Sequence, residues 1–592
     1  MKAILKTTKK APFKQKVFIR MIFVVGIIAF VFSIKFSGNG KNNFPDLRSS
    51  EKIRMPECSS PGGFYEESFF VKLDLSDSNG HIFYTTDGSE PSLASSEYIQ
   101  PFIIEDRTEI RNNLSLIPTS PRWKPPIGNV FKGTILRAIA VNEKNEKSKE
   151  LIQAFFVKGS SSKKYTLPLI SIVVNPKDLF GYNRGIYVLG KNYLDKDNYI
   201  RKGIPLDLPW WEYPSNYLMR GSDAERDAFI QFFEPNGKLG FESDVGIRIH
   251  GNATRGFAQK SIRVCFREKY GKPQLYYDLF DHNSKGVYNS FILRNSGNDW
   301  NKTMFRDAFM QSLMQNSQID IQDYRPSVVF INGEYWGIHN IRERFDEHYL
   351  SNKYNLNVDS ISILELGGEL VQGTKEDEEE FKELIDFVKE NDLSDDSNYD
   401  YIQSKIDINS FTDFIIANVY FCNSDWPNNN VKFWKYASLS DSIYAKDGRW
   451  RWMLYDTDWG FGYNSMSSPQ SNLLLKATSV GSVGLLFGKL IKNKQFADMF
   501  LARFQLHLNT TFNSSVVVKK IDDIQKLLQP EIEEHIDRWR AIESYSEWLE
   551  NVDVLRKFAR ERPALQADQL NVFFNLKDSR QITLKKLPQK VF

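Results

Sequence analysis

Two short polar stretches decide the fold assignment of this sequence: Asp425-Trp-Pro-Asn-Asn-Asn430 and Asp456-Thr-Asp-Trp-Gly-Phe-Gly462. The first follows Ile415-Ile-Ala-Asn-Val-Tyr-Phe-Cys422, an apolar run that predicts the end of a buried helix. The second follows Trp450-Arg-Trp-Met-Leu-Tyr455, which predicts a strand. Each stretch is therefore expected to emerge from a buried element, where polar loops commonly carry function.

The residue types and spacing in these two stretches suit phosphate transfer. Asp425 and Asn430 have the spacing of kinase catalytic loops, in which the aspartate accepts the substrate hydroxyl proton and the asparagine holds a magnesium ion. Asp456, at a strand end beside glycines, suits a hard cation bound together with nucleotide phosphates. Asp458 shares a face with Asp456 if the strand continues, whereas a turn would separate them. We interpret Asp425 as catalytic and Asn430, Asp456 and Asp458 as metal ligands; for each aspartate alone the alternative is a turn cap.

A lysine and a glutamate earlier in the chain are candidates for the phosphate site. Lys260 follows the small residues of 251–256 and opens a predicted strand, where a lysine can neutralise phosphate oxygens. Glu343 could pair with Lys260 as the kinase lysine–glutamate pair does, or form a surface ion pair with Arg342 or Arg344. Spacing does not separate these two interpretations.

The segment 165–545 alternates predicted strands and helices and is expected to be the main domain. Asn332-Gly333, between two apolar runs, predicts a hairpin turn. The expected strands are 167–174, 245–249, 261–266, 290–294, 327–331, 336–342 and 450–455. The expected helices are 303–315, 376–391, 408–422 and 493–545, and the tail 546–592 is expected to pack on this domain with a strand-like segment at 572–574.

Short strands with turn signals occupy residues 58–157, after a polar linker at 37–57. Alternating or β-branched runs fall at 71–75, 82–86, 134–141 and 152–157. Asp87-Gly88 supplies a turn between two of them. This pattern predicts a small β-sandwich.

Residues 1–36 combine a basic start with the apolar run Met21–Ile34. We expect an uncleaved membrane anchor with the basic end cytoplasmic, so that most of the chain lies outside the cytoplasm. The alternative is a signal peptide, after whose cleavage the protein would be secreted.

Composition excludes some classes of partner and site. The net charge of +3 gives no global field for nucleic acid, so we expect none as a partner. Cys58, Cys265 and Cys422 are far apart and do not have zinc-site spacing. A single Cys58–Cys265 disulfide stays open.

The β-rich region resembles a known accessory module. Tyr84-Thr-Thr-Asp-Gly-Ser-Glu-Pro91, with Tyr98 and the strand at 134–141, is similar to the chitobiase C-terminal-type, immunoglobulin-like module. The resemblance implies a spacer, or a module that contacts a cell-wall or surface glycan.

The main domain resembles the CotH kinase family. The resemblance is carried by successive motifs, among them Leu167-Pro-Leu-Ile-Ser-Ile, Gly185-Ile-Tyr-Val, Arg248-Ile-His-Gly-Asn, Asn332-Gly-Glu-Tyr-Trp-Gly and the two stretches quoted first. It implies an α+β fold with a highly diverged protein-kinase-like domain, which binds ATP with Mg²⁺ or Mn²⁺ and phosphorylates serine or threonine hydroxyls of surface or spore-coat-type proteins. It also implies that Lys260, Glu343 and Arg248 bind the nucleotide. His250 stands where the family often has arginine.

Two other functions compete with the kinase. Asp456-x-Asp458 at a strand end also resembles the metal site of glycosyltransferases, but that interpretation leaves Asp425 and Asn430 unexplained. The other alternative is a non-catalytic surface scaffold that binds glycan and carries a pseudokinase domain. Retention of the acidic metal ligands favours the enzyme.

Overall fold

The computed structural model describes residues 53–76, 80–158, 165–193, 202, 209–280, 286–437 and 443–584. Ile53–Phe592 form one compact unit, and Met1–Lys52 form another that lies outside the described residues, as does the expected anchor. Among the helices of the described ranges, none combines the length and apolar character that crossing a bilayer requires. We call residues 53–158 the β module and residues 165–584 the large domain.

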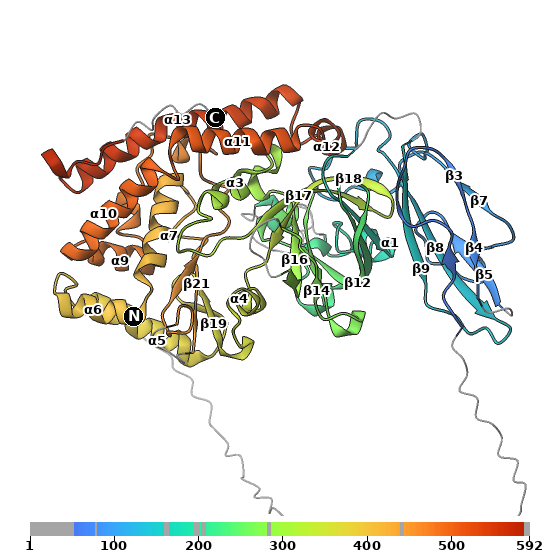
Figure 1. Ribbon diagram of the computed structural model, residues 1–592, viewed down its shortest axis with the longest axis horizontal. Coiled ribbons are helices and arrows are strands. Elements are labelled where there is room, and N and C mark those ends of the chain that lie inside the picture. Colours follow the sequence, from blue (N-terminus) through green and yellow to red (C-terminus); the bar gives the residue numbers. More distant parts are fainter. Residues whose placement is uncertain are drawn as a thin grey trace, which may run out of the picture. The chain divides into compact units, whose positions relative to one another are not determined.

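The β module is built on a five-stranded sheet in the order β2-β9-β8-β5-β6 (Figure 1). Its strands are β2 (Gly63–Tyr65), β5 (Gly80–Thr85), β6 (Ser96–Glu97), β8 (Thr134–Asn142) and β9 (Leu151–Val157). Two small pairs, β1 (Glu57–Cys58) with β4 (Leu73–Asp74) and β3 (Phe69–Val71) with β7 (Phe102–Ile104), complete it. The alternating apolar residues of these strands bury a separate core, which confirms the β-rich N-terminal region.

The large domain begins with a closed barrel in the order β10-β11-β12-β13-β16-β18-β17. A helix, α3, follows the strand β16 and precedes the hairpin β17–β18, whose turn is Asn332-Gly333. The strands are β10 (Leu169–Val174), β11 (Arg226–Phe233), β12 (Leu239–His250), β13 (Ser261–Cys265), β16 (Ser290–Arg294), β17 (Tyr324–Ile331) and β18 (Glu334–Glu343). The helices α1 (Pro176–Phe180) and α3 (Arg306–Leu313) and the pair β14 (Leu275–Tyr276) and β15 (Val287–Tyr288) lie within this part of the chain.

The rest of the large domain combines a four-stranded sheet with helices. The sheet order is β20-β19-β21-β22, formed by β19 (Ile361–Glu365), β20 (Glu369–Gln372), β21 (Lys432–Tyr436) and β22 (Arg451–Met453). The helices are α4 (Glu347–Tyr354), α5 (Lys375–Glu390), α6 (Asp396–Lys405), α7 (Ile408–Phe421), α8 (Leu474–Ala477), α9 (Gly481–Leu490), α10 (Lys494–Asn509), α11 (Ser514–Leu528), α12 (Ile532–Trp539) and α13 (Tyr545–Phe573). Almost every residue of α7 is buried, as its apolar sequence predicts, and α11 and α13 run side by side (Figure 1).

A buried carboxylate joins the β module to the large domain. Glu334, the first residue of β18, accepts hydrogen bonds from the backbone N–H groups of Asn113, Leu114 and Ser115 at 2.7, 3.0 and 2.7 Å. Gly133 N–H also donates to the carbonyl of Gly333 at 2.8 Å. These backbone bonds fix the module against the hairpin, so it is not a loosely attached spacer.

Two expectations about the elements are wrong, and the open question of a disulfide is answered. The stretch 572–574 is the end of α13 and its C-cap and not a strand, and the long helix expected at 493–545 is divided into α10, α11 and α12. All three cysteines are free thiols, so the Cys58–Cys265 disulfide is not formed. The residue types at 572–574 favour a strand, but this stretch ends a helix because α13 packs along the helical core.

Candidate functional site

The loop after α7 brings the first polar stretch of the sequence to the site. Cys422 closes the helix in the left-handed conformation (φ 52°) and turns the chain out of the core. The carboxylate of Asp425 then accepts hydrogen bonds from the side-chain amides of Asn429 (2.8 Å) and Asn430 (3.1 Å). The same Asn430 amide donates to the backbone carbonyl of Asp456 at 3.0 Å. Asn430 thus connects the two polar stretches.

Asp456 and Asp458 lie on either side of an arginine. The strand β22 has ended before Asp456, whose φ of 53° turns the chain, yet both carboxylates reach the same nitrogen: Nη2 of Arg294 lies 2.5 Å from Asp456 and 3.2 Å from Asp458. Asp458 also accepts from the backbone and side-chain amides of Asn298 at 2.8 and 3.3 Å. A Cβ atom at Gly297 (φ 62°) would lie 2.1 Å from the Asp458 carboxylate, so this approach requires glycine.

The burial of the two aspartates differs, and so does the chemistry they can perform. The side chain of Asp458 is 1% exposed, whereas that of Asp456 is 36% exposed. Burial and then the charge of Asp456 raise the pKa of Asp458 well above its ordinary value, against the opposing effect of Arg294. Asp456 is therefore the better placed of the two to meet a cation from solution, and Asp458 mainly holds the Asn298 turn.

A second cation–carboxylate pair, Arg342 with Asp307, lies next to Arg294. Asp307 of α3 lies 2.9 Å from Nη1 of Arg342 and 3.9 Å from Nε of Arg294, and it accepts from the backbone and hydroxyl of Thr457. Burial alone would raise the pKa of Asp307, but Arg342 and Arg294 bring it below its ordinary value. Burial likewise opposes the charge of Arg294, yet Asp456, Asp307 and Asp458 raise its pKa. The centre of the site is thus a fixed ionic network.

The order of these groups along the chain is similar to that of the kinase strand–helix ion pair. The chain runs from β12 through the loop 251–260 to β13. The strand that pairs with β13 in the barrel, β16, supplies the cation Arg294, and the following helix, α3, supplies the carboxylate Asp307. Protein kinases place a loop over the phosphates, a lysine on the third strand and a glutamate on the following helix in this order. Sequence reasoning missed Arg294 and Asp307. Two signals could have found them: Arg294 closes an apolar strand before Asn295-Ser-Gly297, and Asp307 opens an apolar helix.

Lys260 does not take the role expected for it. Its side chain is fully buried, and its ammonium donates to the carbonyls of Arg255 and Phe257 at 2.7 Å each and lies 3.9 Å from the ring centroid of Tyr217. Burial and then Arg255 lower the pKa of Lys260 well below its ordinary value. The lysine fastens the loop from inside.

The expected pair of Lys260 with Glu343 is wrong, and so is a surface ion pair. Glu343 is paired in register with Phe291, whereas the Lys260 backbone carbonyl contacts His339, four residues back along β18. At about 3.3 Å per residue the two groups are roughly 13 Å apart along the strand. The Glu343 carboxylate instead accepts from the backbone N–H of Asp323 at 3.0 Å.

Basic side chains line the barrel side of the site. Arg248 and Arg263 are opposite each other on β12 and β13, and with Arg344 they line a pocket of about 590 Å³. Arg248 is anchored to Glu225 at 3.4 Å, and Arg344 pairs with Asp346. Burial and then Arg344 lower the pKa of Arg263 to about 10. This face offers several cations to an anionic ligand.

His250, at the end of β12, lies among these cations. Burial lowers its pKa well below the ordinary value, and Arg344, Arg294 and Arg263 lower it further. An imidazole held neutral in this way can donate or accept a hydrogen bond but adds no charge.

The acidic and basic sides of the site meet at β21 and β22. Lys432 of β21 lies 3.8 Å from Glu365 and 5.3 Å from the ring centroid of Tyr455. Burial and then the charges of Asp456, Glu365 and Asp425 raise the pKa of Tyr455. These groups therefore lie within electrostatic reach of one another.

Lys476 is a further cation beside Asp425 that sequence reasoning missed. It lies on α8, and its ammonium donates to the carbonyl of Ser424 at 2.8 Å. Burial lowers its pKa, while the charge of Asp425 raises it. The Asp425–Asn430 stretch contains no basic residue of its own, so Lys476 supplies the positive charge there.

The donor set fits Mg²⁺ held jointly with phosphates. The amide nitrogen of Asn430 is committed to Asp425 and Asp456, so its oxygen is the atom that could face a cation, together with the carboxylate of Asp456. In the described part of the chain no three His, Cys, Asp or Glu side chains cluster as a metal site. Mg²⁺ usually takes one or two carboxylates and completes its coordination with phosphates and water.

The site thus combines a cation–carboxylate pair on the barrel side with a loop that contains Asp425 and Asn430 and with Asp456, which follows a strand. The sequence matches the family described as CotH kinase protein over residues 247–565, more than half of the chain, so the protein belongs to that family. Residues 71–155 match the domain described as Fn3 associated, which identifies the β module without specifically supporting the chitobiase-type resemblance. A search of curated proteins found no match.

Proposed function

We propose that the protein is an atypical kinase that transfers phosphate from ATP, with Mg²⁺ or Mn²⁺, to serine or threonine hydroxyls of surface or spore-coat-type proteins. The observation that supports this best is the bridge made by Asn430, which holds Asp425 and Asp456 in one site. Membership of the CotH kinase protein family supports the same reaction class.

In this proposal each residue has a separate task. Asp425, oriented by two amide donors, accepts the proton of the acceptor hydroxyl. Arg294 fixes Asp456, while Arg248, Arg263 and Lys432 offer charge to the nucleotide. When bound, the metal ion would neutralise the phosphate oxygens during transfer.

The test uses the full-length protein with radiolabelled ATP and Mg²⁺ or Mn²⁺. Transfer to the protein itself and to Ser-rich and Thr-rich peptides is measured for the wild type and for Asp425→Asn, which should lose at least about 100-fold in rate. Asp568→Asn, an exposed position on α13, is the matched control and should keep full activity. Equal rates for wild type and Asp425→Asn would refute the proposal.

A pseudokinase scaffold is the second candidate, supported by Arg294. Its guanidinium already pairs with both Asp456 and Asp458, as it would in a domain that holds no metal. Nucleotide binding without transfer to any acceptor would favour the scaffold.

The location of the N-terminal segment and the ligand of the β module are proposals as well. We propose that the segment around Met21–Ile34 anchors the protein in a membrane, with the β module and large domain outside the cytoplasm. The β module would then be available to a surface glycan. Protease protection of intact cells or vesicles tests this topology, since cytoplasmic residues 53–592 would be protected.

A further inference from the structure

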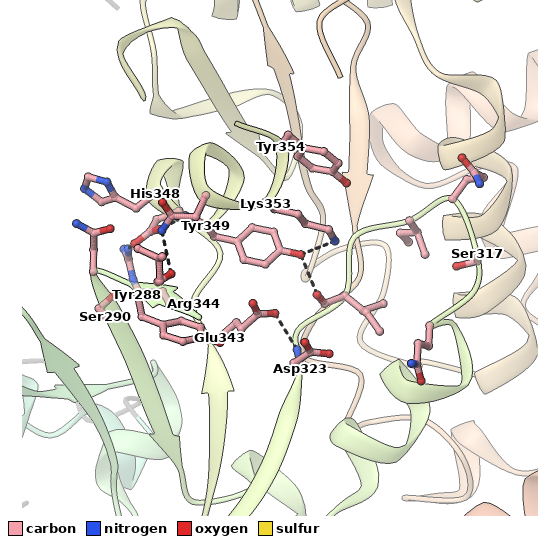
Figure 2. Close-up of a pocket in the computed structure, with 18 of the residues that line it drawn as sticks. Tyr288, Ser290, Ser317, Asp323, Glu343, Arg344, His348, Tyr349, Lys353 and Tyr354 are labelled. Atoms are coloured by element: carbon pink, nitrogen blue, oxygen red, sulfur yellow. Dashed lines mark hydrogen bonds and ion pairs between the residues drawn. The ribbon is translucent and has the colours of Figure 1, made fainter. Parts of the chain in front are cut away.

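Cations of the candidate site gather in a pocket on the barrel side. We call the pocket of about 590 Å³ that Arg248, Arg263 and Arg344 line the basic pocket. Arg344 lies at its border with a neighbouring cavity, which this arginine also lines (Figure 2). Burial lowers the pKa of Lys432, Glu365 opposes this and Arg344 adds to it, so the ammonium of Lys432 is within electrostatic reach of the pocket.

Positive charge is in excess in the basic pocket. The lysine and arginine side chains that line it are Arg248, Arg263, Arg267, Lys269 and Arg344. The carboxylates that pair with them or line the pocket are fewer: Glu225, Asp346, Glu268 and Glu347. Nε of Arg263 is buried without a hydrogen-bond partner among the described residues, and the ion pair of Arg263 with Asp346 spans 3.9 Å. Arg263 therefore has a donor for an anionic ligand.

At the other end of the site, next to the loop 251–260, three basic side chains already have partners. Arg294 pairs with Asp456 and Asp458, and Lys260 donates to two backbone carbonyls of its own loop. The guanidinium of Arg255 donates at 2.7–3.0 Å to the carbonyls of Tyr217, Met219, Ile249 and Gly251. These three cations are therefore not available to the terminal phosphates of a nucleotide, which carry most of its charge.

Strand register gives the distance between the two ends. Leu293 is paired with Ile262, so the next residue, Arg294, lies beside Ser261. Ser261 and Arg263 are two residues apart on β13 and point to the same face of the sheet. At about 3.3 Å per residue, Arg263 is therefore roughly 7 Å from Arg294 along the strand direction. A triphosphate chain can span this distance.

The walls at the two ends suit different parts of a nucleotide. The apolar lining of the basic pocket is limited to Cys265, the buried Phe266 and Pro273. An aromatic surface lies at the other end, where Trp459 follows Asp458 and is partly exposed. The Trp459 carbonyl accepts from the Ser424 hydroxyl at 3.1 Å, and its ring centroid is 5.4 Å from that of Tyr463. A base can stack on such a ring, whereas the basic pocket suits phosphates.

We propose that the site also takes a nucleoside triphosphate in the direction opposite to that of phosphate transfer, with the terminal phosphates in the basic pocket and the α-phosphate beside Asp456, and transfers the nucleotidyl group to a hydroxyl. The acceptor oxygen forms a bond to the α-phosphorus, and the bond from that phosphorus to the bridging oxygen of the β-phosphate breaks. The hydroxyl proton passes to Asp425, and pyrophosphate leaves into the basic pocket. The inference rests on the nucleotide binding of the proposed function, but its product is different.

Two radiolabels on the full-length protein separate the two reactions. ATP labelled at the α-phosphate or at the γ-phosphate is supplied with Mg²⁺ or Mn²⁺ and with Ser-rich and Thr-rich peptides, and covalent label is counted after denaturation. Label from the α-position, with release of pyrophosphate, is expected for the wild type and should fall at least about 100-fold in Asp425→Asn. Label from the γ-position alone would overturn this inference and leave the proposed kinase. Label from the α-position alone would do the reverse, and no label from either position would overturn both.

Binding of inorganic tripolyphosphate, measured by calorimetry, tests the basic pocket apart from activity. Arg263→Met should weaken this binding at least about 10-fold, while Arg560→Met, at an exposed position on α13, should leave it unchanged. Thermal melts show whether each variant is folded, and Arg344→Met is a second variant with the same expected loss. Unchanged affinity in the folded variants, or no binding to the wild type at millimolar tripolyphosphate, would overturn the placement of the terminal phosphates in this pocket.

Discussion

Replacement of Arg294 by methionine tests the ionic network at the centre of the site. The methionine keeps much of the apolar stem and removes the cation that Asp456 and Asp458 share at 2.5 and 3.2 Å. Loss of one partner from a buried charge pair costs about 3 to 5 kcal/mol. Asp307 keeps Arg342, and Asp456 is partly exposed, so we expect the lower end, about 3 kcal/mol at pH 7.

The loss of stability in Arg294→Met should depend on pH in a defined direction. The pKa of Asp458 is already raised by burial, and removal of Arg294 raises it further, so the folded variant holds a proton that the unfolded chain releases. The cost therefore grows as pH rises above the pKa that Asp458 has in the wild type. The difference between variant and wild type should be smaller at pH 5 than at pH 8.

Urea unfolding at the two pH values measures this difference, with Arg560→Met on the exposed face of α13 as the matched control. Under the proposed function, millimolar Mg²⁺ should restore part of the lost stability in Arg294→Met but not when Asp456→Asn is added. A stability loss below about 1 kcal/mol, or one that is equal at pH 5 and pH 8, would refute the reasoning.

Three further changes test neighbouring features. Lys476→Met should lower the rate of phosphate transfer about 10-fold to 100-fold while Lys476→Arg keeps most of it, and equal rates would show that the cation beside Asp425 is not used. Arg562→Met should lower the free energy of unfolding by about 3 kcal/mol, because this buried side chain donates to the Val419 and Tyr420 carbonyls at the end of α7. Urea unfolding measures this loss of stability, and a loss within about 0.5 kcal/mol of zero would contradict the prediction. Glu334→Gln should cost about 2 kcal/mol in the same assay, since one charged acceptor of three N–H groups is lost, and an unchanged midpoint would count against the junction.

Local pattern was enough to predict the elements that enter the site. The apolar run before Cys422 predicted α7, which ends at Phe421, and Asn332-Gly333 predicted the turn between β17 and β18. The spacing of Asp425 and Asn430 suggested a shared loop, and the Asn430 amide does join them. Each of these signals is contained within a few neighbouring residues.

Local sequence pattern could not predict which basic residue pairs with the aspartates of the site. Lys260 and Arg294 both stand at an end of an apolar strand, and only the sheet order decides which faces the loops of Asp425 and Asp456. The lysine is drawn into its own loop because two backbone carbonyls lie within reach of its ammonium. Pairings across strands depend on register, which sequence spacing does not give.

Under the proposal that the segment around Met21–Ile34 anchors the protein, the carboxylate of Glu334 has a mechanical consequence. Glu334 is the first residue of β18 and accepts hydrogen bonds from Asn113, Leu114 and Ser115. A force applied to the β module would therefore act on that strand. The same strand carries Arg342, which contacts Asp307, and ends at Glu343. Under the same proposal, tension on the N-terminal side would pass along β18 toward Arg342 and Glu343.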